Sequence, residues 1–499
     1  MWIPIILACV QFLVHVLTNN NYGIFRDEFY YLACADHLAW GYVDHPPLSI
    51  ALLAVSRALF GDSVQAIRIF SELASALVVV MAGLLAAELG GKRFAQGLSA
   101  LCAAVVPSYL GITGFFSMNA FDLLFWAIAF YLVMRIINTG NRKLWLFFGV
   151  LMGLGLMNKL STLFFGFALF GGLLLTSHRK MLLDKYLWLS GVLAGLIFLP
   201  HILWQFAAGW PTLEFMRNAQ QYKIADLSPI QFMLGTMMEM HPFIFLLCLS
   251  GLIFLLFSRK NRTYRVFGLM YLILLVFFVV QKSKTYYFTP AHVILLAAGA
   301  YAIETWFATR FRWIKFVIVG LIVIGGLISA PLAIPVLPVE TFVAYQTRLG
   351  IKPQASEKHG ETLLPQHFAD RFGWENMTKT IASVYQSLTP DQQTDCTIFA
   401  SNYGEAGAIN YYGRQYGLPQ AISGHNNYHL WGYGKASGKI VISIGMPANE
   451  LRQMFSTVSQ AAIIVSPYAM PYETNLPVYL CSDPKVPIEK VWHEVKMFI

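Results

Sequence analysis

Residues 66–88, AIRIFSELASALVVVMAGLLAAE, are apolar over almost their whole length. A helix rises about 1.5 Å per residue, so about 20 such residues cross a bilayer core about 30 Å thick. The stretch therefore predicts a transmembrane helix. Comparable runs recur before and after it, and together they predict a polytopic α-helical membrane protein with about eleven spans. We place the spans near residues 2–18, 66–88, 95–112, 120–137, 144–157, 160–176, 186–206, 230–257, 266–281, 289–305 and 313–337.

The overall composition agrees with this prediction. Hydrophobic residues make up 57% of the chain and charged residues 12%, whereas soluble globular proteins average roughly 45–50% and 25%. A formal net charge of +9 is also typical of nucleic-acid-binding proteins. Here, however, Lys and Arg fall in short clusters between apolar runs, where membrane topology explains them. We therefore expect no nucleic-acid partner.

The distribution of basic residues predicts the orientation. Fifteen Lys and Arg lie in the loops on one side of the expected spans, and eight lie in the alternate loops. Because the more basic loops face the cytoplasm, we expect a cytoplasmic N-terminus and a C-terminal domain on the outside. In a bacterium this means the inner membrane and the periplasm. The first apolar run lacks a basic n-region and a small-residue cleavage site, so we interpret it as a retained span.

The chain divides into two parts. Residues 1–337 form the expected transmembrane domain, with interfacial helices in the first outer loop, residues 20–62. Residues 338–499 contain short β-rich runs at 396–400, 440–444 and 462–465, which predict a C-terminal α/β domain. Its segments 401–407 and 423–427 suit contact with a sugar or lipid headgroup, and ordinary loop chemistry explains them equally well. An oxidising compartment would permit a disulfide between Cys396 and Cys481.

Two motifs of the first outer loop carry the strongest chemical signal. Residues 26–31, RDEFYY, follow the first span directly, and two adjacent carboxylates there are costly to desolvate unless they have partners or a function. Residues 42–48, YVDHPPL, then open an apolar stretch that is too short to cross. Pro47 suits a first helical turn, and a helix N-terminus beside His45 favours an anionic group. A solvated loop and a purely structural turn are the alternatives.

Other outside-facing loops add polar residues to the same surface. They are Asp122, Lys159, Arg217, Glu239, His241, Lys282, Lys284, Tyr286 and Tyr287. Taken singly, each Lys or Arg is explained as an anchor for lipid headgroups. Taken together, carboxylates and cations on one face of an apolar protein suit a site that handles a lipid phosphate beside a group needing a base.

The order of these motifs resembles that of the GT-C fold glycosyltransferases that use polyprenyl-phosphate sugars. The matching residues are Asp27-Glu28, residues 45–48, Asp122, Lys159 and residues 284–287, KTYY. Within this fold the chain is most similar to the bacterial branch related to protein O-mannosyltransferases and the aminoarabinose lipid A transferase. That branch often has lysine before Pro-Pro, whereas this chain has His45, which is largely neutral near pH 7.

The resemblance implies an inverting glycosyltransferase that moves a sugar from a polyprenyl phosphate to lipid A or a related envelope glycolipid at the periplasmic face. It implies that Asp27 is the catalytic base, a role worth roughly 10²–10⁴-fold in rate. The expected supporting or sugar-binding residues are Glu28, His45, Asp122, Glu239, His241, Tyr286 and Tyr287, and the candidates for the donor phosphate are Lys159, Arg217, Lys282 and Lys284. The sequence shows no ligand spacing for a metal and indicates no other cofactor, and a divalent ion stays an unsupported alternative.

Two other functions remain open. A protein O-glycosyltransferase of the same fold would use an exported protein as its acceptor. A lipid-linked sugar transporter or flippase should place ionisable or helix-breaking residues near mid-membrane, whereas here they collect at the expected outer face. The sequence therefore favours an enzyme, without identifying its sugar or its acceptor.

Overall fold

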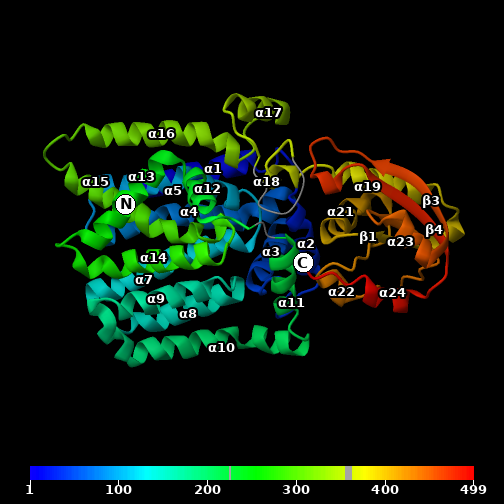
Figure 1. Ribbon diagram of the computed structural model, residues 1–499, viewed down its shortest axis with the longest axis horizontal. Coiled ribbons are helices and arrows are strands. Elements are labelled where there is room, and N and C mark those ends of the chain that lie inside the picture. Colours follow the sequence, from blue (N-terminus) through cyan, green and yellow to red (C-terminus); the bar gives the residue numbers. More distant parts are fainter. Residues whose placement is uncertain (224–225, 354–361) are drawn as a thin grey trace.

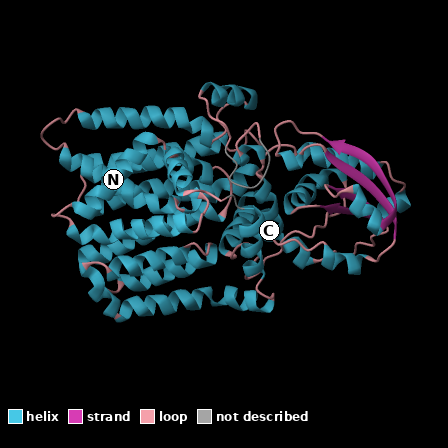
Figure 2. Ribbon diagram, in the orientation of Figure 1, coloured by secondary structure: helices cyan, strands magenta, loops and turns pink. Residues whose placement is uncertain are grey.

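The computed structural model describes residues 1–223, 226–353 and 362–499. Most of these residues are helical, and strands occur at one end of the molecule only (Figure 2). Figure 1 shows long helices running side by side along the longest axis, with the C-terminal α/β part covering one end of this bundle. The N-terminus lies toward the other end.

Helices occupy all of the ranges in which spans were expected. The bundle comprises α1 (Trp2–Thr18), α4 (Val64–Glu88), α5 (Arg93–Val105), α6 (Pro107–Thr113), α7 (Met118–Thr139), α8 (Leu144–Asn158), α9 (Thr162–Leu174), α10 (Lys185–Ala207), α12 (Pro229–Met240), α13 (Pro242–Phe257), α14 (Arg265–Val280), α15 (His292–Trp306) and α16 (Ile314–Ala333). By length and composition, five helices among the described residues can cross a membrane, or seven if each of two bent pairs is one span. The outermost helices expose large apolar side chains, such as Val192 and Phe206 on α10 and Leu327 on α16. Such a surface is stable in lipid.

Two expected spans are broken rather than straight. Over residues 230–257, α12 and α13 meet at 109°, and over residues 95–112, α5 and α6 meet at 56°. Each of these ranges can still be one span, but its helix is bent rather than continuous. Each break falls immediately before a proline, Pro242 or Pro107, because proline cannot donate a backbone hydrogen bond and disfavours a helical residue before it. At His241 the backbone takes a positive φ of 53°, which turns the chain sharply.

The first outer loop contains two short helices, α2 (Arg26–Asp36) and α3 (Leu48–Phe60). Both lie at the bundle end that faces the C-terminal part, as does α11 (Pro211–Asn218) (Figure 1). α2 begins with a capping box, in which the Glu28 carboxylate accepts a hydrogen bond from the Phe25 backbone N–H at 2.7 Å. This cap fixes the start of α2 and therefore the direction in which Asp27 projects.

The C-terminal part is built around a four-stranded sheet of order β1-β2-β4-β3. β1 (Cys396–Ala400) and β2 (Ile440–Ile444) are parallel, and β3 (Phe455–Ile464) and β4 (Leu476–Pro484) are antiparallel to each other. The helices of this part are α17 (Val339–Arg348), α18 (Gln366–Ala369), α19 (Trp374–Gln386), α20 (Pro390–Thr394), α21 (Tyr403–Tyr412), α22 (Asn427–Trp431), α23 (Ala448–Met454) and α24 (Ile488–Glu494). The predicted strands at 396–400 and 440–444 are confirmed with the same bounds, as β1 and β2. The predicted strand at 462–465 corresponds to the end of the longer strand β3, and β4 was not predicted.

The suggested disulfide between Cys396 and Cys481 is wrong. Both cysteines are free, and β2 lies between their two strands. Neighbouring strands are about 4.8 Å apart, so residues two strands apart are separated by more than the roughly 7 Å that a disulfide tolerates between Cα atoms.

One buried core joins the two parts. Phe29, Tyr30 and Leu53 of the first outer loop belong to the same apolar cluster as Ile398 and Ala406 of the C-terminal part. Because this core is continuous, residues of the C-terminal part have fixed positions relative to the outer end of the bundle.

Candidate active site

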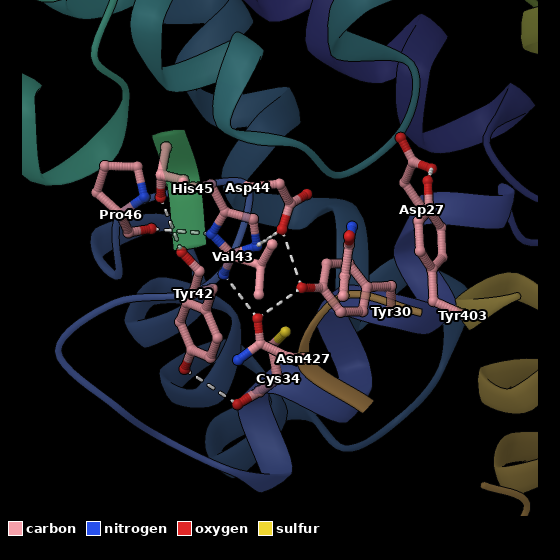
Figure 3. Close-up of polar contacts among 12 residues, drawn as sticks. Asp27, Tyr30, Cys34, Tyr42, Val43, Asp44, His45, Pro46, Tyr403 and Asn427 are labelled. Carbon is pink, nitrogen blue, oxygen red and sulfur yellow. Dashed lines mark hydrogen bonds and ion pairs between the residues drawn. The ribbon is translucent and has the colours of Figure 1, made fainter. Parts of the chain in front are cut away.

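Asp27 lies in the first turn of α2 and is partly exposed. The hydroxyl of Tyr403, at the start of α21, donates a hydrogen bond to its Oδ1 atom at 2.8 Å (Figure 3). Burial and then the negative charge of Asp27 raise the pKa of Tyr403 well above its usual value. Tyr403 therefore keeps its proton and acts as a hydrogen-bond donor at neutral pH.

Glu28, next to Asp27, has a different environment. It is fully buried and forms a bidentate ion pair with Arg68 of α4, at 2.8 Å from Nε to Oε1 and 2.6 Å from Nη2 to Oε2. It also accepts a hydrogen bond from the backbone N–H of Phe116 at 2.6 Å, and Arg68 donates to the carbonyl of Gly23 at 2.8 Å. Glu28 therefore holds α2 against α4 and the segment before α7.

The segment before α3 is held by α2 and by the C-terminal part. The side-chain oxygen of Asn427 accepts a hydrogen bond from the backbone N–H of Val43 at 2.7 Å. The hydroxyl of Tyr30 lies 2.9 Å from this same oxygen and 2.9 Å from Oδ1 of Asp44. Figure 3 shows Asp44 and His45 on one side of this network and Asn427 on the other.

His45 is buried among the rings of Tyr30, Tyr31 and Tyr42, with ring centres 4.9–5.9 Å away. Its Nδ1 atom lies 2.9 Å from the carbonyl of Pro46, and its Nε2 atom lies 3.9 Å from Asp44. Within the described chain, Nε2 makes no hydrogen bond. The arrangement is a closely packed imidazole whose Nε2 atom is buried.

A second polar group surrounds Lys159, in the turn between α8 and α9. Its Nζ atom donates to Asn119 at 2.7 Å and lies 3.4 Å from the buried carboxylate of Asp122, which also accepts from Ser161 at 2.8 Å. The same cation lies 5.1 Å from the ring centre of Tyr287 and 5.8 Å from that of Tyr286. Lys159, Asp122, Tyr286 and Tyr287, widely separated in sequence, therefore meet in one cluster.

The segment before α7 joins the two groups. The backbone N–H of Phe116 donates to Glu28, next to Asp27, and the Phe116 ring centre lies 6.0 Å from that of Tyr31. Three residues further on, Asn119 accepts a hydrogen bond from Lys159. Tyr31 is buried, and its pKa is raised well above the usual value by burial and then by Asp27, Asp44, Tyr403 and Tyr286. The structure thus brings Asp27, His45, Asp122, Lys159 and the two tyrosines into one region.

The remaining expected site residues have other surroundings. Glu239 accepts a hydrogen bond from Thr285 and so joins α12 to the 3₁₀ turn Thr285–Tyr287, which Lys284 immediately precedes. His241 is buried at the α12–α13 bend, where a side chain at Gly325 of α16 would touch its ring. Lys282 forms an exposed ion pair with Asp226 at 3.3 Å, and Arg217 is exposed in the last turn of α11.

Two buried acids of the C-terminal part, Glu405 and Glu473, lie close to Arg26 of α2. The guanidinium of Arg26 lies over the rings of Tyr403 and Tyr472, at 5.0 and 5.3 Å. Nearby, burial raises the pKa of Glu473 to about 7, and burial together with Glu473 raises the pKa of Glu405 well above its usual value. Arg26 thus packs against the tyrosine that contacts Asp27.

Three residues of this region were not assigned roles from the sequence: Tyr30, Asp44 and Arg68. Arg68 had a signal, since a charge within an otherwise apolar span is costly unless it is paired. Tyr403 and Asn427 lie in segments that we had identified as candidates for sugar or headgroup contact; in the structure they contact Asp27 and the segment before α3. Among residues 1–223, 226–353 and 362–499, no group of three or more His, Cys, Asp or Glu side chains could hold a metal ion.

Comparison with known proteins identifies the fold. Residues 44–204 match the model of the dolichyl-phosphate-mannose-protein mannosyltransferase family. The ArnT structure from Cupriavidus metallidurans in the apo state covers 96% of this chain and 97% of its own, with a TM-score of 0.59 and 15% identity. The same protein bound to undecaprenyl phosphate gives a TM-score of 0.61 at 14% identity, covering 95% of this chain and 97% of its own.

These matches confirm the expected GT-C fold over nearly the whole chain, and with it a multi-pass membrane protein. In sequence, the chain is 26% identical over 167 residues to an undecaprenyl phosphate-alpha-4-amino-4-deoxy-L-arabinose arabinosyl transferase from Pseudomonas savastanoi pv. phaseolicola. The matched segment covers 33% of this chain and 26% of the length of that relative.

Proposed function

We propose that this chain is an inverting glycosyltransferase that moves a sugar from a polyprenyl-phosphate donor to lipid A or a related envelope glycolipid. The observation that carries the proposal is a partly exposed carboxylate, Asp27, and a cation, Lys159, in groups that the segment before α7 joins through Phe116 and Asn119. A base and a phosphate-binding cation are the two groups that such a transfer needs. The names of the relatives, one of them bound to undecaprenyl phosphate, support a lipid-phosphate donor.

In the proposed reaction, Asp27 accepts the proton of an acceptor hydroxyl while that oxygen attacks the anomeric carbon of the donor sugar. The bond between this carbon and the phosphate oxygen breaks, and its electrons leave with the polyprenyl phosphate. Lys159 stabilises the charge of the phosphate. Attack on the side opposite the leaving group inverts the anomeric centre, and no covalent glycosyl-enzyme forms.

The other expected residues take supporting roles in this proposal. Glu28 holds α2 through Arg68, Asp122 orients Lys159, and His45 packs among three tyrosine rings beside Asp44. Tyr286 and Tyr287 pack against the lysine. The exposed positions of Arg217 and Lys282 suit contact with lipid headgroups better than contact with the reacting phosphate.

We also propose that this site faces the periplasm of a bacterial inner membrane, with residues 338–499 on the same side and the N-terminus in the cytoplasm. The fifteen-to-eight bias of basic residues supports this orientation. That the site and the C-terminal part share one side is supported by the position of α2, which carries Asp27, at the bundle end next to the C-terminal part (Figure 1). A reporter active only in the periplasm should work when fused after residue 499 and fail when inserted at residues 140–142. The reverse pattern would contradict the orientation.

The transfer assay tests the function itself. The purified full-length protein is mixed with radiolabelled undecaprenyl-phosphate-linked sugars and with lipid A. We expect label on lipid A, in the anomeric configuration opposite to that of the donor, together with an equal amount of free undecaprenyl phosphate. Label on an acceptor peptide instead would identify a protein O-glycosyltransferase. Movement of intact donor across vesicle membranes without bond cleavage would identify a transporter.

A further inference from the structure

We propose that the C-terminal domain contributes two positioning residues to the active site. Tyr403 positions the Asp27 carboxylate, and Asn427 holds the segment before α3 in place. The kinetic test of this inference rests on the proposed function. The structural test does not. Tyr403 and Asn427 are positioning residues rather than catalytic ones. Their contacts join residues about 400 positions apart in the sequence (Figure 3).

Tyr403 has little freedom to move. Its ring stacks on that of Tyr30 with centres 4.7 Å apart and an interplanar angle of 27°. The Arg26 guanidinium lies 5.0 Å from the ring centre, and the ring of His425 lies 4.4 Å away. The Tyr403 backbone N–H also lies 3.3 Å from Nδ1 of His425. A donor held this firmly restricts the rotation of the carboxylate that accepts its hydrogen bond.

Asn427 connects three segments through one oxygen atom. It accepts from the Val43 backbone and lies within hydrogen-bond distance of Tyr30, which in turn reaches Asp44. The amide side chain is itself buried. Through these contacts the start of α22 determines where the residues that precede Pro46 and Pro47 lie, including His45.

The close approach of α21 to α2 makes these contacts possible. A Cβ atom at Gly407 would lie 2.8 Å from the carbonyl oxygen of Phe29, and one at Gly404 would lie 2.6 Å from Cγ of Arg26. Any larger residue at Gly407 would displace backbone atoms. α21 of the C-terminal domain therefore packs directly against α2, the helix that carries Asp27. Only glycine at position 407 allows so close an approach.

The kinetic test is Tyr403→Phe, which removes one hydroxyl and keeps the ring. Donation to the ionised carboxylate stabilises it, so without the hydroxyl Asp27 stays protonated to a higher pH. The other charged and titratable groups around Asp27 and Tyr403, namely Arg26, Tyr31 and Asp44, are the same in both proteins. We expect kcat to fall about tenfold with little change in the KM for the donor, and the acidic limb of the kcat profile to move up by roughly 0.5–1 pH unit.

The matched control is Tyr468→Phe. Its hydroxyl also reaches a carboxylate, Glu340 of α17, at 3.3 Å, but on the exposed side of the domain. The control should keep wild-type kcat and pH profile. Equal kcat and an unmoved acidic limb in Tyr403→Phe would overturn the positioning role of Tyr403.

The structural test does not depend on activity. In Asn427→Ala the Val43 amide loses its acceptor, so hydrogen exchange in the peptide that contains Val43 should accelerate at least about tenfold relative to wild type and to Tyr468→Phe. Unchanged exchange would overturn the role of Asn427. If wild type transfers no sugar, the proposed function fails and this exchange result still decides whether the domain holds the segment. If Asn427→Ala does not fold, Tyr403→Phe alone decides the inference.

Discussion

Two adjacent acids at the start of α2 have different tasks because their side chains point to different surroundings. Asp27 is partly exposed and accepts a hydrogen bond from Tyr403, whereas Glu28 is buried and accepts from Arg68 and from two backbone N–H groups. A carboxylate with this many partners is poorly placed to accept a proton from a substrate. The sequence motif alone shows two acids, and only their burial distinguishes them.

The first prediction follows from this difference. Glu28→Gln should destabilise the protein, because removing one partner of a buried ion pair typically costs roughly 3–5 kcal/mol. Thermal unfolding in detergent should show a melting temperature several degrees below wild type. Asp27→Asn is the control and should melt like wild type. Equal melting temperatures for wild type and Glu28→Gln would contradict the structural role of Glu28.

The second prediction concerns Glu473, whose pKa burial raises to about 7. The unfolded carboxyl ionises near pH 4.5, so the folded state binds more protons between these values. This contribution to stability is complete below pH 4.5 and is lost as the pH rises through about 7. Glu473→Gln keeps the neutral form at every pH. Its melting temperature relative to wild type should therefore rise between pH 5 and pH 8, by roughly 3–5 °C.

The control for this pH effect is Glu375→Gln, at an exposed position where Glu375 pairs with Lys379 on α19. Its melting temperature should track wild type at both pH values, since exposed pairs contribute about 0–1 kcal/mol. A constant difference between Glu473→Gln and wild type from pH 5 to pH 8 would show that Glu473 is ionised in the folded protein throughout.

At the scale of elements, the strand order of the C-terminal sheet makes a third prediction. Because β2 separates β1 from β4, Cys396 and Cys481 cannot pair. Protein that is denatured and alkylated without reductant should carry the modification on all six cysteines, as measured by intact mass. A species in which two cysteines react only after reduction would show that the sheet has a different order.

The elements also show where sequence reasoning succeeds and where it stops. Long apolar runs such as residues 66–88 predict helices well, because few alternatives bury so many apolar side chains in lipid. The α12–α13 bend was missed because residues 230–257 are apolar on both sides of it, although His241-Pro242 carried the signal of a helix start. β4 was missed since it begins at Leu476-Pro477 and ends at Pro484, and proline argues against a strand.

The candidate site was predictable only in part, for a related physical reason. Asp27, Lys159 and Asp122 carry charge beside apolar runs, and such charges are conspicuous in sequence. Tyr403 and Asn427 are ordinary residues in a Gly/Asn-rich region, and their importance depends on long-range packing of α21 against α2. The close contact between Gly407 and Phe29 cannot be predicted from the neighbouring sequence of either residue.

At the scale of the whole molecule, the candidate site lies at one end of the helical bundle, which the α/β part covers (Figure 1). Residues from the first outer loop, from the turns after α6 and α8, from the segment after α14 and from the C-terminal domain meet there. This convergence is what a single active site requires. The structural match to ArnT extends over nearly the whole of both chains, so the fold is similar from the bundle to the C-terminal part.

The most direct measurement is single-turnover sugar transfer by Asp27→Asn, with undecaprenyl phosphate binding measured on the same preparation. The amide keeps the size and most hydrogen bonds of the carboxylate but cannot accept the proton, so transfer should fall about 100-fold or more while binding is retained. Lys159→Met should show the opposite pattern, with weakened binding of the lipid phosphate. Folded Asp27→Asn protein that transfers sugar at the wild-type rate would contradict the central claim that this carboxylate is the base.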